Sequence, residues 1–202
     1  MTTSHGRTAR PPLRTDARLN REQLLAAAQD VFAEGGPGAS LNEIARRAGV
    51  GPGTLYRHFP NRQALLTAVL RDRVEGLCGQ AEKLLTSDSP DQALYRWLDA
   101  FLAHARSNRG MGSALMIEEP GELGLDCHGL ILDAAAGLLT RAQQQGTARA
   151  DLTADDLLQL VTGIALSTVR SKDAEQPSRL LALVLDATHE TPSGKTPPHR
   201  NR

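Results

Sequence analysis

The chain has 202 residues, 40% of them hydrophobic, and its 23 basic and 23 acidic side chains give a formal net charge of zero. This length suits one large domain or a small domain joined to a medium one, and a neutral total by itself predicts no nucleic-acid partner. The distribution of charge along the chain is more informative. Residues 1–62 carry nine basic and five acidic residues, whereas the remainder carries fourteen basic and eighteen acidic residues. A basic front and an acidic rear predict that only the front meets a polyanion.

Residues 1–16, rich in Thr, Arg and Pro, predict a flexible basic arm. A first helix follows, from a cap at Asn20 to about Glu34. Ser40 with Glu43 three positions on is a capping box, which predicts a short helix to Arg47 or Ala48.

Gly49 then supplies the left-handed residue of a tight turn, and Pro52 suits the first position of a helix that runs to Phe59. A longer helix is predicted from near Asn61 to about Leu85. Further helices are predicted at 91–107, about 111–117, 125–145, 154–171 and 176–189. Strand patterns are absent, so the predicted fold class is all-α with about nine helices.

The ends and the cysteines limit the protein's location. Residues 190–202 predict a disordered, Pro-rich tail. Cys78 and Cys127 are far apart and form no C-x-x-C pair, which argues against a disulfide framework or zinc site and favours reduced thiols. No apolar run approaches the roughly 20 residues that span a bilayer, and no secretory signal follows the N-terminal arginines. We expect a cytoplasmic protein with no cofactor, metal or membrane partner.

Two short helices joined by a Gly-containing turn, at residues 40–48 and 52–59, are the sequence form of a helix-turn-helix. One face of this segment is apolar and predicts packing against the first helix: Leu41, Ile44, Ala45, Val50, Leu55 and Phe59. The other face carries groups that suit phosphates and base edges: Asn42, Arg46, Thr54, Tyr56, Arg57 and His58. Alternative interpretations make Tyr56 a cover for the core, His58 a structural residue, and Arg46 and Arg47 part of a solvated face.

The stretch LLAAAQDVFAEGGPGASLNEIARRAGVGPGTLYRHFPNRQALLTAVL resembles the N-terminal domain of the TetR (tetracycline repressor-like, TetR/AcrR) family of bacterial transcriptional regulators. The resemblance covers residues 18 to about 75. It is specific because Ile-Ala-x-x-Ala-Gly-Val, Thr-Leu-Tyr-x-His-Phe, a following basic residue and Ala-Leu-Leu occur at the family spacing. The rear two-thirds resembles the family only in the number and length of its helices. The family resemblance implies a DNA-binding domain at 17–76 and a ligand-binding and dimerisation domain at 77–189. These two domains lie between the arm (1–16) and the tail (190–202).

The resemblance also implies a set of DNA contacts: Arg18, Ser40, Asn42, Arg46, Gly51, Pro52, Gly53, Thr54, Tyr56, Arg57, His58, Asn61 and Arg62. Tyr56 and His58 match a ring pair that grips phosphate, and Arg62 replaces the usual lysine. Gly51 departs from the Ser or Thr that caps the recognition helix in many members. Direct readout is therefore expected from Asn42, Thr54, Arg57 and the basic arm around Arg14 and Arg18, with backbone contacts and DNA shape supplying the rest.

The rear helices at 154–171 and 176–189 are apolar on wide faces, which predicts a homodimer through a four-helix interface. The alternative is that both helices are internal core. A pocket for a small, largely apolar effector is predicted from Trp97, Phe101, His104, Met111, Leu115, Met116, Cys127 and His128. The alternative for these residues is plain core.

The resemblance to the family implies a DNA-binding repressor that such an effector releases from a palindromic operator. The alternative function is a dimeric architectural or effector-independent DNA-binding protein. An enzyme is not expected, because no nucleophile elbow, phosphate-binding loop or zinc spacing occurs.

Overall fold

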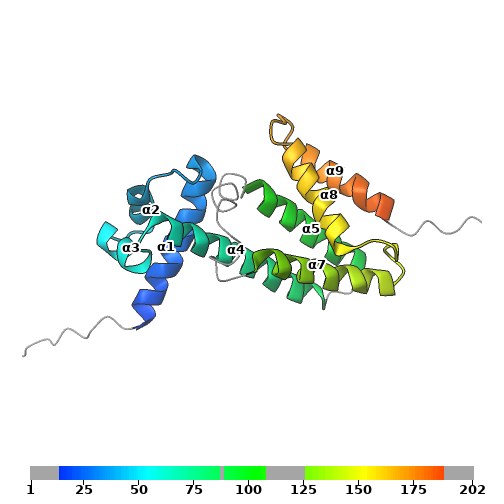
Figure 1. Cartoon of the computed structure of the whole chain (residues 1–202), viewed down its shortest axis with the longest axis horizontal. Helices are drawn as coiled ribbons and strands as arrows, with labels where there is room; N and C mark the ends of the chain where they lie inside the picture. Colours follow the sequence, from blue (N-terminus) through cyan, green and yellow to red (C-terminus); the bar gives the residue numbers. More distant parts are fainter. Residues whose placement is uncertain (1–13, 87–88, 108–125, 189–202) are drawn as a thin grey trace, which may run out of the picture. The chain divides into compact units, whose positions relative to one another are not determined.

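The computed structural model describes residues 14–86, 89–107 and 126–188, which form eight helices and no strand (Figure 1). The helices are α1 (Arg14–Gly35), α2 (Leu41–Arg47), α3 (Pro52–His58), α4 (Arg62–Leu84), α5 (Pro90–Ser107), α7 (Cys127–Gln144), α8 (Ala154–Ser167) and α9 (Gln176–Thr188). The all-α prediction is confirmed. The helix predicted at 111–117 lies outside the described residues. No helix in the described part of the chain is long and apolar enough to cross a membrane.

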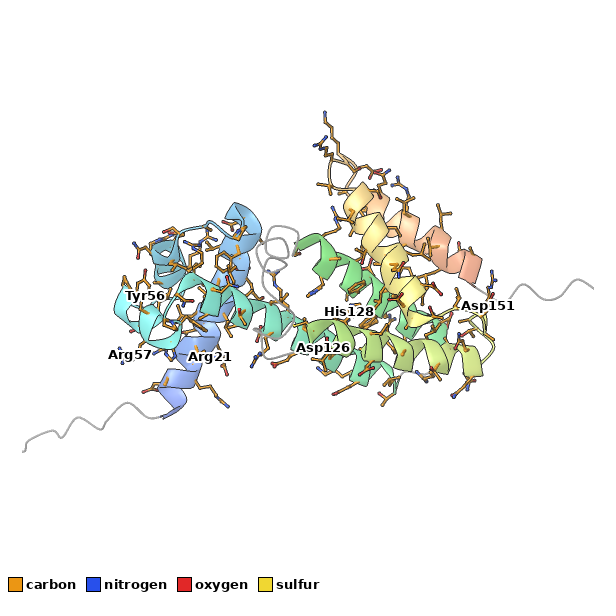
Figure 2. The ribbon with its side chains drawn as sticks, in the orientation of Figure 1. Arg21, Tyr56, Arg57, Asp126, His128 and Asp151 are labelled. Carbon is orange, nitrogen blue, oxygen red and sulfur yellow. The ribbon has the colours of Figure 1, made fainter. Side chains whose placement is uncertain are left out.

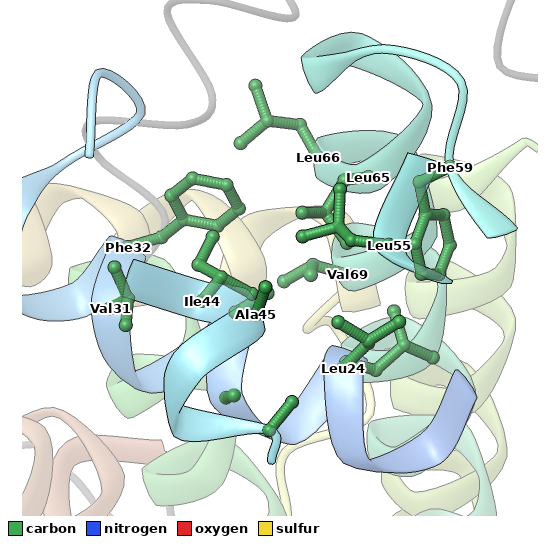
Figure 3. Packing of buried hydrophobic residues seen from close by; sticks show 14 residues of the cluster. Leu24, Val31, Phe32, Ile44, Ala45, Leu55, Phe59, Leu65, Leu66 and Val69 are labelled. Atoms are coloured by element: carbon green, nitrogen blue, oxygen red, sulfur yellow. The ribbon is translucent and has the colours of Figure 1, made fainter. Parts of the chain in front are cut away.

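The chain divides into two compact units, and the first contains α1 to α3 and the front part of α4, up to Asp72. Its core gathers apolar side chains from all four helices around Leu24, Ile44, Leu55 and Leu65, each at most 1% exposed (Figure 3). The predicted apolar face is confirmed, because Leu55 and Phe59 are buried and Leu41 and Val50 pack against the cluster. This burial holds the short helices α2 and α3, which are too short to be stable alone.

The turn between α2 and α3 forms as its residues predict. Gly49 has a φ of +68°, which an L side chain rarely adopts, and Pro52 occupies the first turn of α3. Ser40 caps α2 by accepting a hydrogen bond from the backbone N–H of Glu43 at 3.4 Å. The Glu43 side chain does not complete the predicted capping box, because its carboxylate binds Arg46 and Arg47 instead.

The second unit, from Arg73 on, is organised around α5, which contacts α7, α8 and α9. Trp97 of α5 is fully buried, and its indole N–H donates to the carbonyl of Leu77 at 2.9 Å. The predicted capping box of Thr153 and Asp156 opens α8 with both of its hydrogen bonds, and Gly146 ends α7 with a φ of +69°. A cap at Asp126, which accepts from the N–H of Gly129, was not predicted.

Two predicted helix boundaries are wrong. The first helix starts at Arg14, so Asn20 lies within it and does not cap it; Asp16 supplies the acidic side chain of the first turn. The helix predicted to reach residue 171 ends at Ser167. There the hydroxyl of Thr168 donates to the carbonyl of Ile164 at 2.7 Å, and this side-chain bond satisfies a terminal carbonyl where the helix stops.

Candidate DNA-binding site and effector cavity

The recognition helix α3 separates its apolar and polar side chains sharply. Leu55 is 1% exposed and lies in the core, whereas the adjacent Tyr56 is 49% exposed. The Tyr56 side chain therefore lies outside the core, and this exposure disfavours the alternative in which Tyr56 covers the core. Figure 2 shows Tyr56 and Arg57 on α3, and the Arg57 side chain has no ion pair or hydrogen bond to another described residue. On α1, the Arg21 guanidinium lies 5.6 Å from the centre of the Phe59 ring.

Most of the predicted DNA contacts are solvent-exposed. The exposed positions are Arg18, Ser40, Asn42, Arg46, Gly51, Pro52, Gly53, Tyr56, Arg57 and Asn61. Thr54, His58 and Arg62 are half-buried. Gly51 caps α3 without a side-chain hydrogen bond, and a Cβ placed at Gly51 or Gly53 would meet no atom within 4 Å. At the start of the recognition helix the backbone is therefore accessible, with no side chain of the described residues covering it at Gly51 or Gly53.

The basic residues of α2 are held by two carboxylates, a network that sequence reasoning missed. Glu43 binds the guanidinium of Arg46 through two hydrogen bonds of 2.8 Å and that of Arg47 at 2.9 Å. Arg47 also makes a two-bond pair with Glu34 of α1. These hydrogen bonds lower the pKa of Glu43 to about 2. The spacing of three and four residues between Glu43 and the arginines is the sequence signal that predicts these pairs.

Two predicted contacts at the front of α4 also have roles inside the protein. The Arg62 guanidinium donates through Nη1 to the carbonyls of Pro37 and Ala39, at 2.8 and 2.5 Å. The side-chain oxygen of Asn61 accepts from the N–H of Ala64 at 2.7 Å and so caps α4. Their DNA contacts stay predictions, and the structure adds that both residues fix the start of α4.

In the second unit, two of the predicted effector contacts line one cavity. It has a volume of about 400 Å³ and is lined by Phe101, His128, Ile131 and residues of α8: Asp155, Leu158, Gln159, Thr162, Gly163 and Leu166. The α8 residues were not predicted, because the sequence does not show which face of α8 meets α5 and α7. Trp97 stacks on Phe101 with ring centres 5.9 Å apart, behind this wall.

The other predicted effector residues are not brought to this cavity. His104 lines a separate hollow of about 300 Å³ with Arg73 and Leu77 of α4. Burial, with a smaller effect of the Arg73 charge, lowers the pKa of His104 to about 4. Cys127 is the first residue of α7 and lines neither cavity. Met111, Leu115 and Met116 lie outside the described residues.

Helices α8 and α9 each bury one face, and large apolar side chains are exposed on both: Leu160 and Leu166 on α8, and Leu183 on α9. Leu166 and Leu183 are 59% and 65% exposed, and Leu160 and Val169, which follows α8, are 45% and 53% exposed. The buried face of α8 includes Leu157, Val161 and Ile164. Exposed apolar side chains on two helices that contact each other can mark a protein–protein interface.

Comparisons with known proteins follow the same division of the chain. Residues 24–69 match the model of the bacterial regulatory proteins of the tetR family, and residues 89–187 match that of the C-terminal domain of SbtR-like transcriptional regulators. The crystal structure of a TetR transcriptional regulator from Streptomyces coelicolor superposes with a TM-score of 0.75 at 40% identity, covering 84% of this chain and 98% of that one.

Curated relatives match the front of the chain. The regulator UidR of Escherichia coli K12 is 37% identical over 59 residues, which are 29% of this chain and 30% of that protein. The transcriptional activator FasR of Mycolicibacterium smegmatis is 41% identical over 83 residues, 40% of this chain and 38% of that protein. The chain therefore spans about a third of the length of these curated relatives.

Proposed function

The chain belongs to the TetR family of bacterial transcriptional regulators, and on this premise we propose that it is a cytoplasmic repressor that a small, largely apolar effector releases from a palindromic operator. DNA binding and transcriptional regulation come with the family. The direction of regulation, the operator symmetry and the effector are the proposal. The observation that carries it is a helix-turn-helix whose recognition helix buries Leu55 and Phe59 and exposes Tyr56 and Arg57.

The exposed side chains of α2 and α3 supply the contacts to DNA. Tyr56 offers a phenol to phosphate oxygens, and the Arg57 guanidinium can bind a phosphate or a base edge, while Asn42 and Thr54 offer an amide and a hydroxyl to base edges. Arg46 joins them by exchanging Glu43 for a phosphate. That exchange gives up the two hydrogen bonds between Arg46 and Glu43, while the Glu43 carboxylate keeps Arg47 as a partner.

A homodimer through α8 and α9 supplies the symmetry of the operator. Two copies of the exposed apolar surface at Leu160, Leu166, Val169 and Leu183 would cover one another in a two-fold interface. A dimer with two recognition helices reads half-sites about 34 to 36 Å apart or at a multiple of that distance. A palindromic site follows from that symmetry.

The effector is proposed to bind in the cavity at Phe101, His128 and Ile131. Its volume of about 400 Å³ is within the range of small-molecule sites. Because Thr162 and Leu166 of α8 also line it, a bound molecule would lie beside the proposed dimer surface. Such a ligand can alter both the position of α8 and the packing of α5.

Helix α4 is the proposed route from effector to DNA. It is one helix from Arg62 to Leu84, and it contributes Leu65 and Val69 to the core of the first unit and Val74 and Leu77 to the buried residues of the second. To shift most of the dimer from its operator-binding form to its released form, the effector must bind the released form more tightly by several kcal/mol.

The test begins with selection of binding sites from random duplex DNA, followed by footprinting of the best sequence. A short protected palindrome supports the repressor, and uniform coverage supports the architectural alternative. A reporter gene behind the selected operator then gives the direction of regulation; activation would refute repression, and the name of FasR shows that relatives include an activator. Compounds that bind at the α5–α8 cavity without changing operator affinity would refute the effector mechanism.

A further inference from the structure

A second cavity of about 400 Å³ lies in the rear unit and shares no lining residue with the proposed effector cavity. Its walls are the first two turns of α5, the turn after α7 and the last turns of α9. The side chains that carry the argument are Asp91, Leu94, Tyr95, Ala148, Leu185 and Asp186.

The floor of this cavity is apolar and its rim aromatic. Leu94, Ala148 and Leu185 are all buried, so they form a fixed hydrophobic surface. Tyr95 is 37% exposed at the edge, so part of its ring is open to solvent and to a ligand. A flat or aliphatic ligand body can lie on this floor beside the ring.

The polar groups of the cavity favour a positive charge. Asp91 is half-buried and Asp186 is exposed, and within the described part of the chain neither carboxylate has a side-chain hydrogen bond or ion pair. Arg96 is the one basic side chain of the lining, and it makes no ion pair with either of them. Asp91 and Tyr95 are four residues apart on α5, so they lie on the same side of the helix. An ammonium group there contacts a carboxylate and an aromatic face together.

We propose that this cavity binds an amphipathic organic cation, an amine or quaternary ammonium carried on an aromatic or aliphatic body. This site is additional to the effector cavity, and its ligand is recognised by charge, whereas the proposed effector is recognised by apolar contact. The proposal does not depend on repression or on any operator, because binding is measured without DNA.

The test is calorimetric titration of the full chain with three indole compounds of similar size: tryptamine, a cation; tryptophol, which is neutral; and indole-3-acetate, an anion. Tryptamine should bind at least about tenfold more tightly than tryptophol, and indole-3-acetate should bind most weakly. Equal affinities, preference for the anion through Arg96, or no binding of tryptamine would overturn the proposal.

Variants and methyl NMR locate the site. The double change Asp91→Asn and Asp186→Asn should weaken tryptamine about tenfold or more, while Asp133→Asn, at an exposed carboxylate of α7 outside the cavity, should not. Tryptamine should shift the methyl resonances of Ala148 and Leu185 and leave that of Ile131, in the effector cavity, in place. Shifts at Ile131 alone would place the cation in the effector cavity and refute a second site.

Discussion

The sharpest prediction concerns Arg62→Ala, because the structure gives this side chain two separable roles. Its Nη1 group donates to the carbonyls of Pro37 and Ala39, in the turn that leads into α2. Arginine has five N–H donors, so Nε and Nη2 retain donors for a phosphate. The side chain can therefore tie the turn to α4 and bind DNA at the same time.

The magnitude follows from the two hydrogen bonds. A hydrogen bond to a charged group contributes about 1.5 to 3 kcal/mol, and these two share one half-buried NH₂ group and lie partly in solvent. Removing them should lower the free energy of unfolding by about 2 kcal/mol. Loss of one phosphate contact should reduce the slope of log affinity against log salt by about one unit.

The assays are urea denaturation at one fixed protein concentration and a salt series of binding to the selected operator. Arg57→Ala is the matched control, since Arg57 is exposed and its side chain has no partner among the described residues; it should reduce the salt slope and leave stability unchanged. Arg62→Lys should keep the salt slope and lose part of the stability. An unchanged slope for Arg62→Ala refutes the phosphate contact, and unchanged stability refutes the tie to the turn.

Three further predictions concern helix α3 and His104. Gly51→Ser should raise the free energy of unfolding by roughly 0.5 kcal/mol in urea, because Gly51 has extended backbone angles, open space around its Cβ position and no side-chain cap. Gly53→Ala should also stabilise α3, by about 0.8 kcal/mol, yet weaken operator binding in a gel-shift assay; unchanged binding would contradict close approach of Gly53 to DNA. His104→Gln should reduce the loss of stability in urea between pH 7.5 and 5 by at most about 2 kcal/mol. Burial lowers the His104 pKa from 6.5 to about 4, so the unfolded chain binds a proton first and stability falls as pH drops through this window.

The helical elements were predictable because their signals are local. The Thr153–Asp156 capping box, the positive φ at Gly49 and Pro52 at the start of α3 each depend on a few neighbouring residues. The apolar periodicity of the first unit likewise located its core. The start of α1 was missed because Asn20 is a good cap by type, although nothing at that position required the helix to begin there.

The sites were less predictable because they depend on pairs of elements. The bonds of Arg62 to Pro37 and Ala39 join residues more than 20 positions apart, and no spacing rule announces them. In the rear unit, helical spacing grouped Trp97, Phe101 and His104 as one pocket. In the structure Trp97 is buried, Phe101 lines the effector cavity and His104 lines a separate hollow. The three side chains are separated because the packing of α4, α7 and α8 around α5 decides which neighbour each side chain meets.

The open front of the recognition helix has a consequence for the proposed mechanism. Gly51, Pro52 and Gly53 present no hydrogen-bonding side chain where α3 begins, so each half-site is read by few groups. A good two-bond base contact discriminates by only about 1 to 3 kcal/mol, and a single subunit with few such contacts discriminates weakly. Specificity then depends on two half-sites being engaged together at one spacing. An effector that changes this spacing therefore removes most of the discrimination without touching any residue that contacts DNA.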